Sequence, residues 1–294
     1  MRLANGPATL VLQISVAVAG LSIAPPRTAA ANDLPSYLAP KKNEAPNAAG
    51  TRLTARAVVE RIFQAPPNTR PDLQAADLTK LDLAGIDFRA ALLTGANLYG
   101  ADLTNARLAS ASLEGASLDR ATITATDFSD ADLTDVRIIR PTVFTSLVAA
   151  AKEAPKFTGA KLVRFRSDGQ LDRADFTGAD LTDAVIGRSA VREPAVNAPA
   201  SLVQTDFTRA VLKGARLAQT SLQSASFVDA DLRGTDLSQC DLLRADFSGA
   251  DLTGANLTGA NLAEANLRTA RGLDKAIGLE KAVNLEQAYR APAP

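Results

Sequence analysis

Large apolar residues recur at every fifth position over two long stretches of the chain, residues 73–138 and 202–267. Alanine is the commonest residue two positions before each large one, and aspartate or asparagine often stands between the two. On an α-helix a step of five residues turns by about 500°, so successive large residues would share no face. On a flat strand an odd period sends alternate residues to opposite faces. The pattern therefore predicts a backbone that turns once in every five residues.

The spacing of the phenylalanines predicts how many turns make one coil. Phe207, Phe227 and Phe247 are twenty residues apart, and Phe88 and Phe128 are forty apart. If each phenylalanine stacks on a like residue of the next coil, one coil has four sides and about twenty residues, with coils about 4.8 Å apart. The residues that we expect to point inward are Leu73, Leu78, Phe88, Leu98, Leu103, Phe128, Phe207, Phe227, Cys240, Phe247, Leu252 and Leu257.

Runs such as ADLTGANLTGANLAEANLRTA and TGANLYGADLTNARL resemble the A-(D/N)-L-x-x signature of the pentapeptide-repeat family. The resemblance covers about residues 71–140 and 199–270, with weaker matches over residues 157–196. It implies an all-β solenoid, a right-handed quadrilateral (four-sided) parallel β-helix with about 20 residues per coil. It implies little about function, because one fold can host many unrelated functions.

The first fifty residues predict a leader and a spacer. Residues 1–31 contain Arg2, an apolar run over residues 8–24 and small residues at positions 29 and 31, as in a secretory signal peptide. We expect cleavage before Asn32, with an uncleaved anchor as the alternative. Residues 32–50 are rich in Ala, Pro, Asn and Lys, which predicts a disordered linker.

The remaining divisions follow from where the five-residue period starts, breaks and ends. Residues 51–70 predict an N-terminal helical cap, because Val58, Val59, Ile62 and Phe63 have helical spacing behind Thr54; a partner-binding helix is the alternative. The chain then divides into repeat block 1 at 71–140, an irregular insertion with degenerate repeats at 141–199, repeat block 2 at 200–270, and a C-terminal cap and tail at 271–294.

Two of these divisions leave the architecture open. The insertion is compatible with one continuous solenoid with bulged loops, or with two half-solenoids that meet at a hinge. After Leu267 the period becomes six, with leucine at positions 273, 279 and 285, which fits a wider final coil or a short helical cap. Because the ends of a solenoid need covering, we also hypothesise a homodimer through a solenoid end.

Composition removes most enzyme classes. Lys plus Arg and Asp plus Glu each number 32, histidine is absent, and Cys240 is the single cysteine. These counts exclude Ser-His and Cys-His nucleophile pairs, imidazole metal sites, thiolate zinc sites and an internal disulfide. The repeated aspartates predict turn-stabilising side chains, with cation binding as the alternative, and Cys240 predicts a small buried residue. We therefore expect no enzyme, no catalytic or metal residue and no cofactor.

The expected function is an exported, non-enzymatic scaffold for protein interaction or structure, in the periplasm or cell envelope or secreted. We expect an unknown protein partner, no nucleic acid, and no membrane insertion after signal cleavage. Some pentapeptide-repeat proteins mimic DNA with an acidic rod and bind type II topoisomerases, so the resemblance implies this alternative. Here Arg107, Arg120, Arg209 and Arg216 interrupt the acidic residues. A cation-binding envelope protein is the other alternative.

Overall fold

The computed structural model describes residues 52–144, 150–168, 170–187 and 200–290, all within one compact unit, Pro46–Pro294. The predicted signal peptide at 1–31 and the predicted linker at 32–50 lie outside the described residues. None of the described helices is long and apolar enough to cross a membrane.

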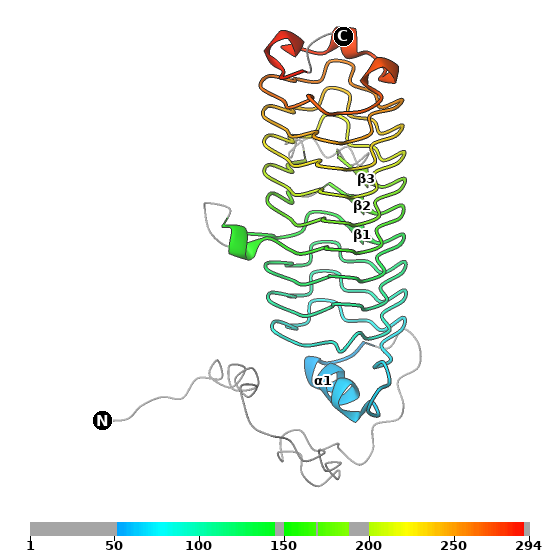
Figure 1. The fold of residues 1–294 in the computed structure, drawn as a ribbon. Coiled ribbons are helices and arrows are strands. Elements are labelled where there is room, and N and C mark those ends of the chain that lie inside the picture. The colour runs from blue at the N-terminus through cyan, green and yellow to red at the C-terminus, as the bar shows by residue number, and fades with distance from the viewer. Residues whose placement is uncertain (1–51, 145–149, 169, 188–199, 291–294) are drawn as a thin grey trace, which may run out of the picture. The chain divides into compact units, whose positions relative to one another are not determined.

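From Asp72 the chain winds into stacked coils joined by parallel β-bridges (Figure 1). In the two regular stretches each bridge joins residues twenty apart, as in Asp72 with Leu92 and Asp231 with Asp251. The bridged residue is the one directly before each large apolar residue. The predicted parallel β-helix is thus confirmed. We name the four sides after the aspartates of the first full coil: side A begins at Asp72, side B at Asp77, side C at Asp82 and side D at Asp87.

Each corner is a short turn that the sequence encodes locally. The Ala76 N–H donates to the Leu73 carbonyl at 3.2 Å, which closes the turn between sides A and B. In most repeats the second residue after the large one has a left-handed backbone, with φ of +67° at Gly95 and +57° at Lys80. Glycine is the residue that adopts this conformation without steric cost, which explains its frequency at this place.

The interior is one continuous hydrophobic core of large and small residues. On side D the rings of Phe128, Phe157, Phe176, Phe207, Phe227 and Phe247 stack in sequence, with centroids 4.7–5.1 Å apart and planes within 8° of parallel. This column contains the three phenylalanines whose spacing predicted the coil. It passes without a break through the middle of the chain.

The irregular middle is part of the same solenoid. Along side D, Asp127 pairs with Lys156, Lys156 with Asp175, and Asp175 with Asp206, which are separations of 29, 19 and 31 residues. The longer separations mean that these two coils contain extra residues, and the shorter one means that a coil has lost one residue. The two half-solenoids joined by a hinge are therefore ruled out for the described residues.

Three two-residue strands mark side B in these middle coils. They are β1 (Arg137–Ile138), β2 (Arg166–Ser167) and β3 (Val185–Ile186), which form a parallel sheet in the order β1-β2-β3. In the coil of β2 the usual sizes are exchanged, because Phe165 occupies the small position and Ser167 the large one, and both are buried. The exchange keeps the filled volume of this side roughly constant, as a close-packed interior requires.

The helix α1 (Ala55–Gln64) lies at the first coil (Figure 1). Thr54 caps its N-terminus, with its hydroxyl oxygen accepting the Ala57 N–H at 3.1 Å. Val58 and Ile62 are buried in the solenoid core, and the Arg89 guanidinium donates to the Ile62 carbonyl at 2.8 Å. The same helix leaves Phe63 55% exposed.

The last described coil has wider sides. Its corners are the 3₁₀ turns η4 (Leu273–Lys275), η5 (Leu279–Lys281) and η6 (Leu285–Gln287), and another 3₁₀ turn, η3 (Ala151–Glu153), lies in the middle insertion. Ile277, Val283 and Tyr289 still bridge to the coil before them. The six-residue period is therefore a wider coil with 3₁₀ corners, which joins the two interpretations that the sequence left open.

Candidate functional site

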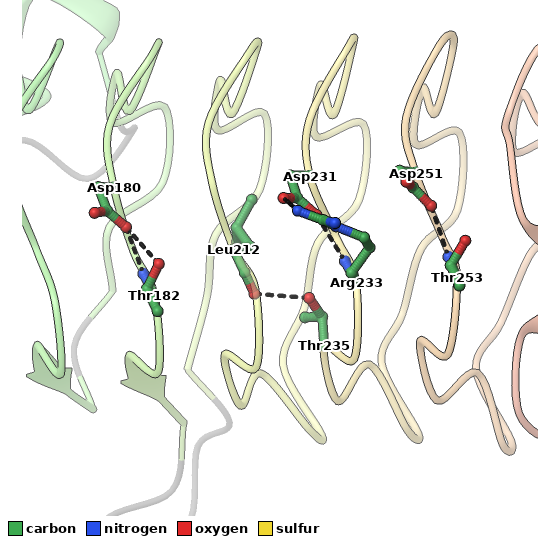
Figure 2. A network of polar contacts seen from close by, with 8 residues as sticks. All are labelled: Asp180, Thr182, Leu212, Asp231, Arg233, Thr235, Asp251 and Thr253. Atoms are coloured by element: carbon green, nitrogen blue, oxygen red, sulfur yellow. Dashed lines mark hydrogen bonds and ion pairs between the residues drawn. The ribbon is translucent and has the colours of Figure 1, made fainter.

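The outward residue of each side is most often an aspartate that binds its own turn. Asp180 Oδ1 accepts the backbone N–H of Thr182 at 3.0 Å and its hydroxyl at 2.6 Å, and Asp251 Oδ1 accepts the Thr253 N–H at 3.0 Å (Figure 2). Hydrogen bonds from the Thr253 side chain and backbone hold the pKa of Asp251 below its ordinary value. These carboxylates are thus turn-stabilising groups, as the sequence predicted.

Neighbouring coils place these outward side chains in ladders along each side. Near the C-terminal end, asparagines of one coil lie next to aspartates of the coil before it. Asn256 Nδ2 donates to Asp236 Oδ1 at 3.2 Å, and Asn261 Nδ2 donates to Asp241 Oδ1 at 3.0 Å. An amide above a carboxylate makes a hydrogen bond where two carboxylates would repel each other.

Basic side chains enter the same ladders. Arg137, Arg166 and Arg216 stand at the outward position of side B, and all three are exposed. On side A, Lys161 Nζ lies 3.2 Å from a carboxylate oxygen of Asp132. Elsewhere Arg233 pairs with Asp231, which lowers the pKa of Asp231 mainly through its side-chain hydrogen bond (Figure 2). The faces of the solenoid therefore carry both signs of charge.

Threonine and cysteine side chains at the small inward position donate to the backbone of the preceding coil. The hydroxyl of Thr235 donates to the Leu212 carbonyl at 2.8 Å (Figure 2), and the Cys240 thiol donates to the Leu217 carbonyl at 2.9 Å. Burial raises the pKa of Cys240 to about 12, so its thiol stays protonated at neutral pH. Sequence reasoning missed this use of threonine, although threonine in place of alanine at the small position was a visible signal.

The twelve residues expected to point inward are all in the core. None of them is more than 1% exposed, and they are spread over the four sides and most coils instead of meeting at one point. Among the residues that the structure describes, no three Cys, Asp or Glu side chains group closely enough to hold a metal ion. The arrangement offers long faces for contact. Three of the exposed large hydrophobic residues, Ile277, Val283 and Tyr289, form an apolar ring on the outside of the last described coil.

Comparison with known proteins supports the repeat reading. The family model for pentapeptide repeats matches eight copies, over residues 72–108, 101–138, 200–239 and 230–268. The comparison with curated proteins finds no match.

Among solved structures the chain is similar to HetL, a pentapeptide repeat protein involved in heterocyst differentiation regulation from the cyanobacterium Nostoc. The TM-score is 0.54 at 25% identity, over 79% of this chain and 92% of HetL. A pentapeptide repeat protein of the Arabidopsis thaliana thylakoid lumen matches at TM-score 0.24 and 34% identity, over 36% of this chain and 60% of that protein. QnrB1, a plasmid-mediated fluoroquinolone resistance protein, matches at TM-score 0.27 and 21% identity, over 60% of this chain and 84% of QnrB1.

The bridged coils, the inward large and small residues and the matched repeats agree with one another, and they show that this chain carries pentapeptide repeats over residues 72–138 and 200–268.

Proposed function

We propose that the protein is a non-enzymatic scaffold that binds a partner protein along one or two sides of the solenoid. In this proposal the scaffold is a right-handed four-sided β-helix of about 20 residues per coil, with α1 as its N-terminal cap. It is exported, and it works in the periplasm or cell envelope or outside the cell.

The observation that carries the proposal is the regular presentation of outward side chains. Parallel bridges hold these side chains at the strand spacing, about 4.8 Å from coil to coil, over a long rigid face. The aspartates in them are already bound to their own turns, as Asp180 is to Thr182, so they serve the fold first. Such a face recognises a partner by pattern and shape, as the surfaces of other solenoids do.

The mixed charge of the faces favours a scaffold that recognises its partner by pattern and shape over a protein that imitates a DNA duplex. A duplex presents one negative charge per about 1.7 Å. Side B instead carries Arg137, Arg166 and Arg216 in its outward ladder, and side A carries Lys161. A protein that imitates a duplex to bind a DNA-binding enzyme would need a more uniformly negative face. The mixed charge therefore disfavours this alternative.

Site-specific photocrosslinking in cells tests the proposal. A photoreactive amino acid replaces one exposed residue on each side: Lys213 on side A, Arg216 on side B, Gln170 on side C and Arg107 on side D. We expect one defined protein adduct from one side or from two adjacent sides. Equal adducts from all four sides, or none from any of them, would contradict the proposal. Lysates of the same cells irradiated in urea are the control, since unfolding must abolish a face-specific adduct.

Cell fractionation tests the location separately. We expect the mature chain outside the cytoplasm, with Asn32 as its first residue by mass spectrometry. Intact protein beginning at Met1 in the cytoplasm would contradict export, while leaving the crosslinking result to decide the scaffold role.

A further inference from the structure

One side of the solenoid carries a cluster of arginines in its middle coils. On side B the outward ladder residues of four consecutive coils are Arg137, Arg166, Val185 and Arg216, in the coils of β1, β2, β3 and the next one (Figure 1). The three arginines are exposed, and so is Arg120 at the corner of the coil before them. We call these four arginines the side B arginine cluster.

The ladders of the neighbouring sides separate their basic residues with acidic ones. On side A, Lys161 stands between Asp132 and Asp180, and the basic ladder residues of side D alternate with aspartates in the same way. The ladder of side B contains no aspartate from one coil after Asp77 to one coil before Asp236. Positive charge therefore gathers on side B, while sides A and D balance theirs.

The carboxylates of side B in these coils are already bound. Two of them belong to the described residues. Asp119 Oδ1 accepts the Ile139 N–H at 3.0 Å, and its second oxygen forms an ion pair with Arg137. Asp168 Oδ1 accepts the Arg140 N–H at 2.8 Å. Because Asp119 is only 9% exposed, a partner that approaches this side meets the guanidinium of Arg137 before it meets the carboxylate.

The rest of the cluster combines free charge with apolar contact. Within the described part of the chain, neither Arg166 nor Arg216 forms an ion pair. Val185 lies between them in the ladder and is partly exposed, as are Ile139 and Ala218 beside the ladder. A guanidinium binds a carboxylate through two N–H groups, and its aliphatic stem packs on apolar neighbours. This surface thus suits a ligand that carries both carboxylates and apolar groups.

We infer that the side B arginine cluster binds an extended acidic segment of the partner protein, in which apolar side chains stand among the carboxylates. Three coil steps separate Arg137 from Arg216, which is about 14 Å along the solenoid, or about four to five residues of extended chain. The inference deepens the proposed function by naming the side and the chemistry of the partner, and it rests on the scaffold being a binding protein.

A uniform polyanion such as a nucleic acid or polyphosphate fits this surface less well. It gains affinity from many phosphate contacts along its length. Here the cluster ends at Asp236 on the following coil, and Asp183 is exposed at the corner with side A. The formal charge of the whole chain is zero, so no wider field attracts a long polyanion. A short acidic segment avoids these carboxylates.

Fluorescence anisotropy with synthetic peptides tests the inference on the whole protein. The probe is a labelled peptide in which glutamate alternates with valine. The same peptide with serine in place of glutamate controls for apolar contact, and the peptide with lysine controls for the sign of charge. We expect the glutamate peptide to bind about tenfold or more tightly than the serine peptide, the lysine peptide not to bind, and binding to weaken as salt is added.

Paired variants locate the binding. Arg166→Glu/Arg216→Glu reverses two exposed charges of the cluster, and we expect it to weaken binding of the glutamate peptide about tenfold or more. Arg107→Glu/Arg209→Glu is the matched control, because it changes the net charge equally at exposed positions outside side B, and it should bind like the unaltered protein. Arg166→Gln/Arg216→Gln removes the charge without reversing it and should fall between the two. Circular dichroism and thermal melting check that each variant is folded.

Three outcomes would overturn the inference. The first is a glutamate peptide that binds no better than the serine peptide. The second is an equal loss of binding in the cluster variant and in the matched control, which would mean that net charge alone attracts the peptide. The third is polyphosphate that binds more tightly than the glutamate peptide at equal charge, which would assign the cluster to a polyanion.

Photocrosslinking in cells separates this inference from the scaffold role. A photoreactive residue at Gln219, which is exposed at the corner next to Arg216, keeps every arginine in place. Mass spectrometry of its adduct should find a partner peptide rich in aspartate and glutamate. Adducts confined to sides C and D would refute the arginine cluster and leave the scaffold. Peptide binding that depends on Arg166 and Arg216, with no adduct from any side, would support the cluster and contradict the scaffold.

Discussion

At the scale of single residues, the left-handed corner position tolerates several residue types and requires glycine only in some places. Arg209 and Gln239 adopt φ of +58° and +57° at this position. A non-glycine residue there costs roughly 1–2 kcal/mol of strain, which a solenoid can bear when the side chain points to solvent. Glycine is needed where another coil approaches the backbone. Gly272 is such a place, because a Cβ atom added to it would lie 2.1 Å from Thr253 Oγ1 and 2.8 Å from the Thr253 nitrogen.

We predict that Gly272→Ala lowers the free energy of unfolding by about 2–4 kcal/mol, as the sum of left-handed strain and crowding. Gly95→Ala is the matched control. It has the same φ of +67° and nothing within 4 Å of the added atom, so it should lose only about 1 kcal/mol. Urea denaturation of both variants measures the difference. Equal losses would mean that Thr253 moves aside freely and that the contact does not select glycine.

The asparagine ladder gives a second prediction at this scale. Asn256→Asp replaces a donated hydrogen bond to Asp236 with two facing carboxylates, and should cost about 1 kcal/mol at pH 7. The repulsion is present only while both groups are ionised, so the loss should shrink as the pH falls below about 4. Asn256→Ser removes the amide donor without adding a charge, so its loss at pH 7 should be smaller than that of Asn256→Asp. Urea denaturation at pH 7 and pH 3.5 separates the two variants.

At the scale of elements, α1 is attached to the solenoid by one face of a single helix. We predict that Ile62→Ala lowers the free energy of unfolding by about 2–4 kcal/mol, because Ile62 is 4% exposed and lies in the core. Phe63→Ala is the control on the same helix, and should change it by less than about 0.5 kcal/mol because Phe63 is largely exposed. Hydrogen exchange adds a local readout: Ile62→Ala should increase exchange in the first coil more than in the coil of Phe247. Uniform acceleration would show that α1 does not act locally.

The elements also show which parts of the fold the sequence could predict. The column of Phe207, Phe227 and Phe247 followed directly from their spacing, because a coil of constant length converts spacing into stacking. Where a coil gains or loses residues this conversion fails. Phe157 and Phe176 stack at 4.7 Å although they are 19 residues apart, and only the structure places them in the column. The exchange of Phe165 and Ser167 could not be predicted for the same reason. With the large and small positions exchanged and the register shifted, this side lacks the repeat pattern and resembles a loop in the sequence.

The candidate interaction surfaces were predictable to a smaller degree. The repeat predicted that outward side chains would line up along each side. It did not predict which of these side chains contact one another, because that depends on which residues lie one coil apart. The residues of the apolar ring, Ile277, Val283 and Tyr289, directly follow Ala276, Ala282 and Ala288 in the sequence. The changed period concealed that these residues occupy the aspartate position.

At the scale of the whole molecule, the solenoid gains pH-dependent stability from several turn carboxylates whose pKa is lowered, among them Asp77, Asp132, Asp175, Asp231 and Asp251. A hydrogen bond from the Thr79 hydroxyl, and then the Thr79 backbone N–H, hold the pKa of Asp77 below its ordinary value, and Thr253 acts on Asp251 in the same way. A carboxyl whose pKa is lower in the folded state stabilises that state above its unfolded pKa, near 4, and loses this contribution as the pH falls through the folded pKa. Each contribution is small because these groups face water, yet the same turn recurs on every side.

We therefore predict a free energy of unfolding that is nearly constant from about pH 5 to 8 and falls steeply below about pH 4. Urea denaturation across this range measures the profile. Thr79→Ala removes one hydroxyl donor to Asp77, so the pKa of Asp77 should move up towards its ordinary value in a carboxyl NMR titration while Asp251 titrates as before. Stability that increases on acidification from pH 5 to 3 would mean that repulsion between stacked carboxylates, and not their bonds to the turns, governs the ladders. The turns would then have to be held by their backbone hydrogen bonds and by the packed interior alone.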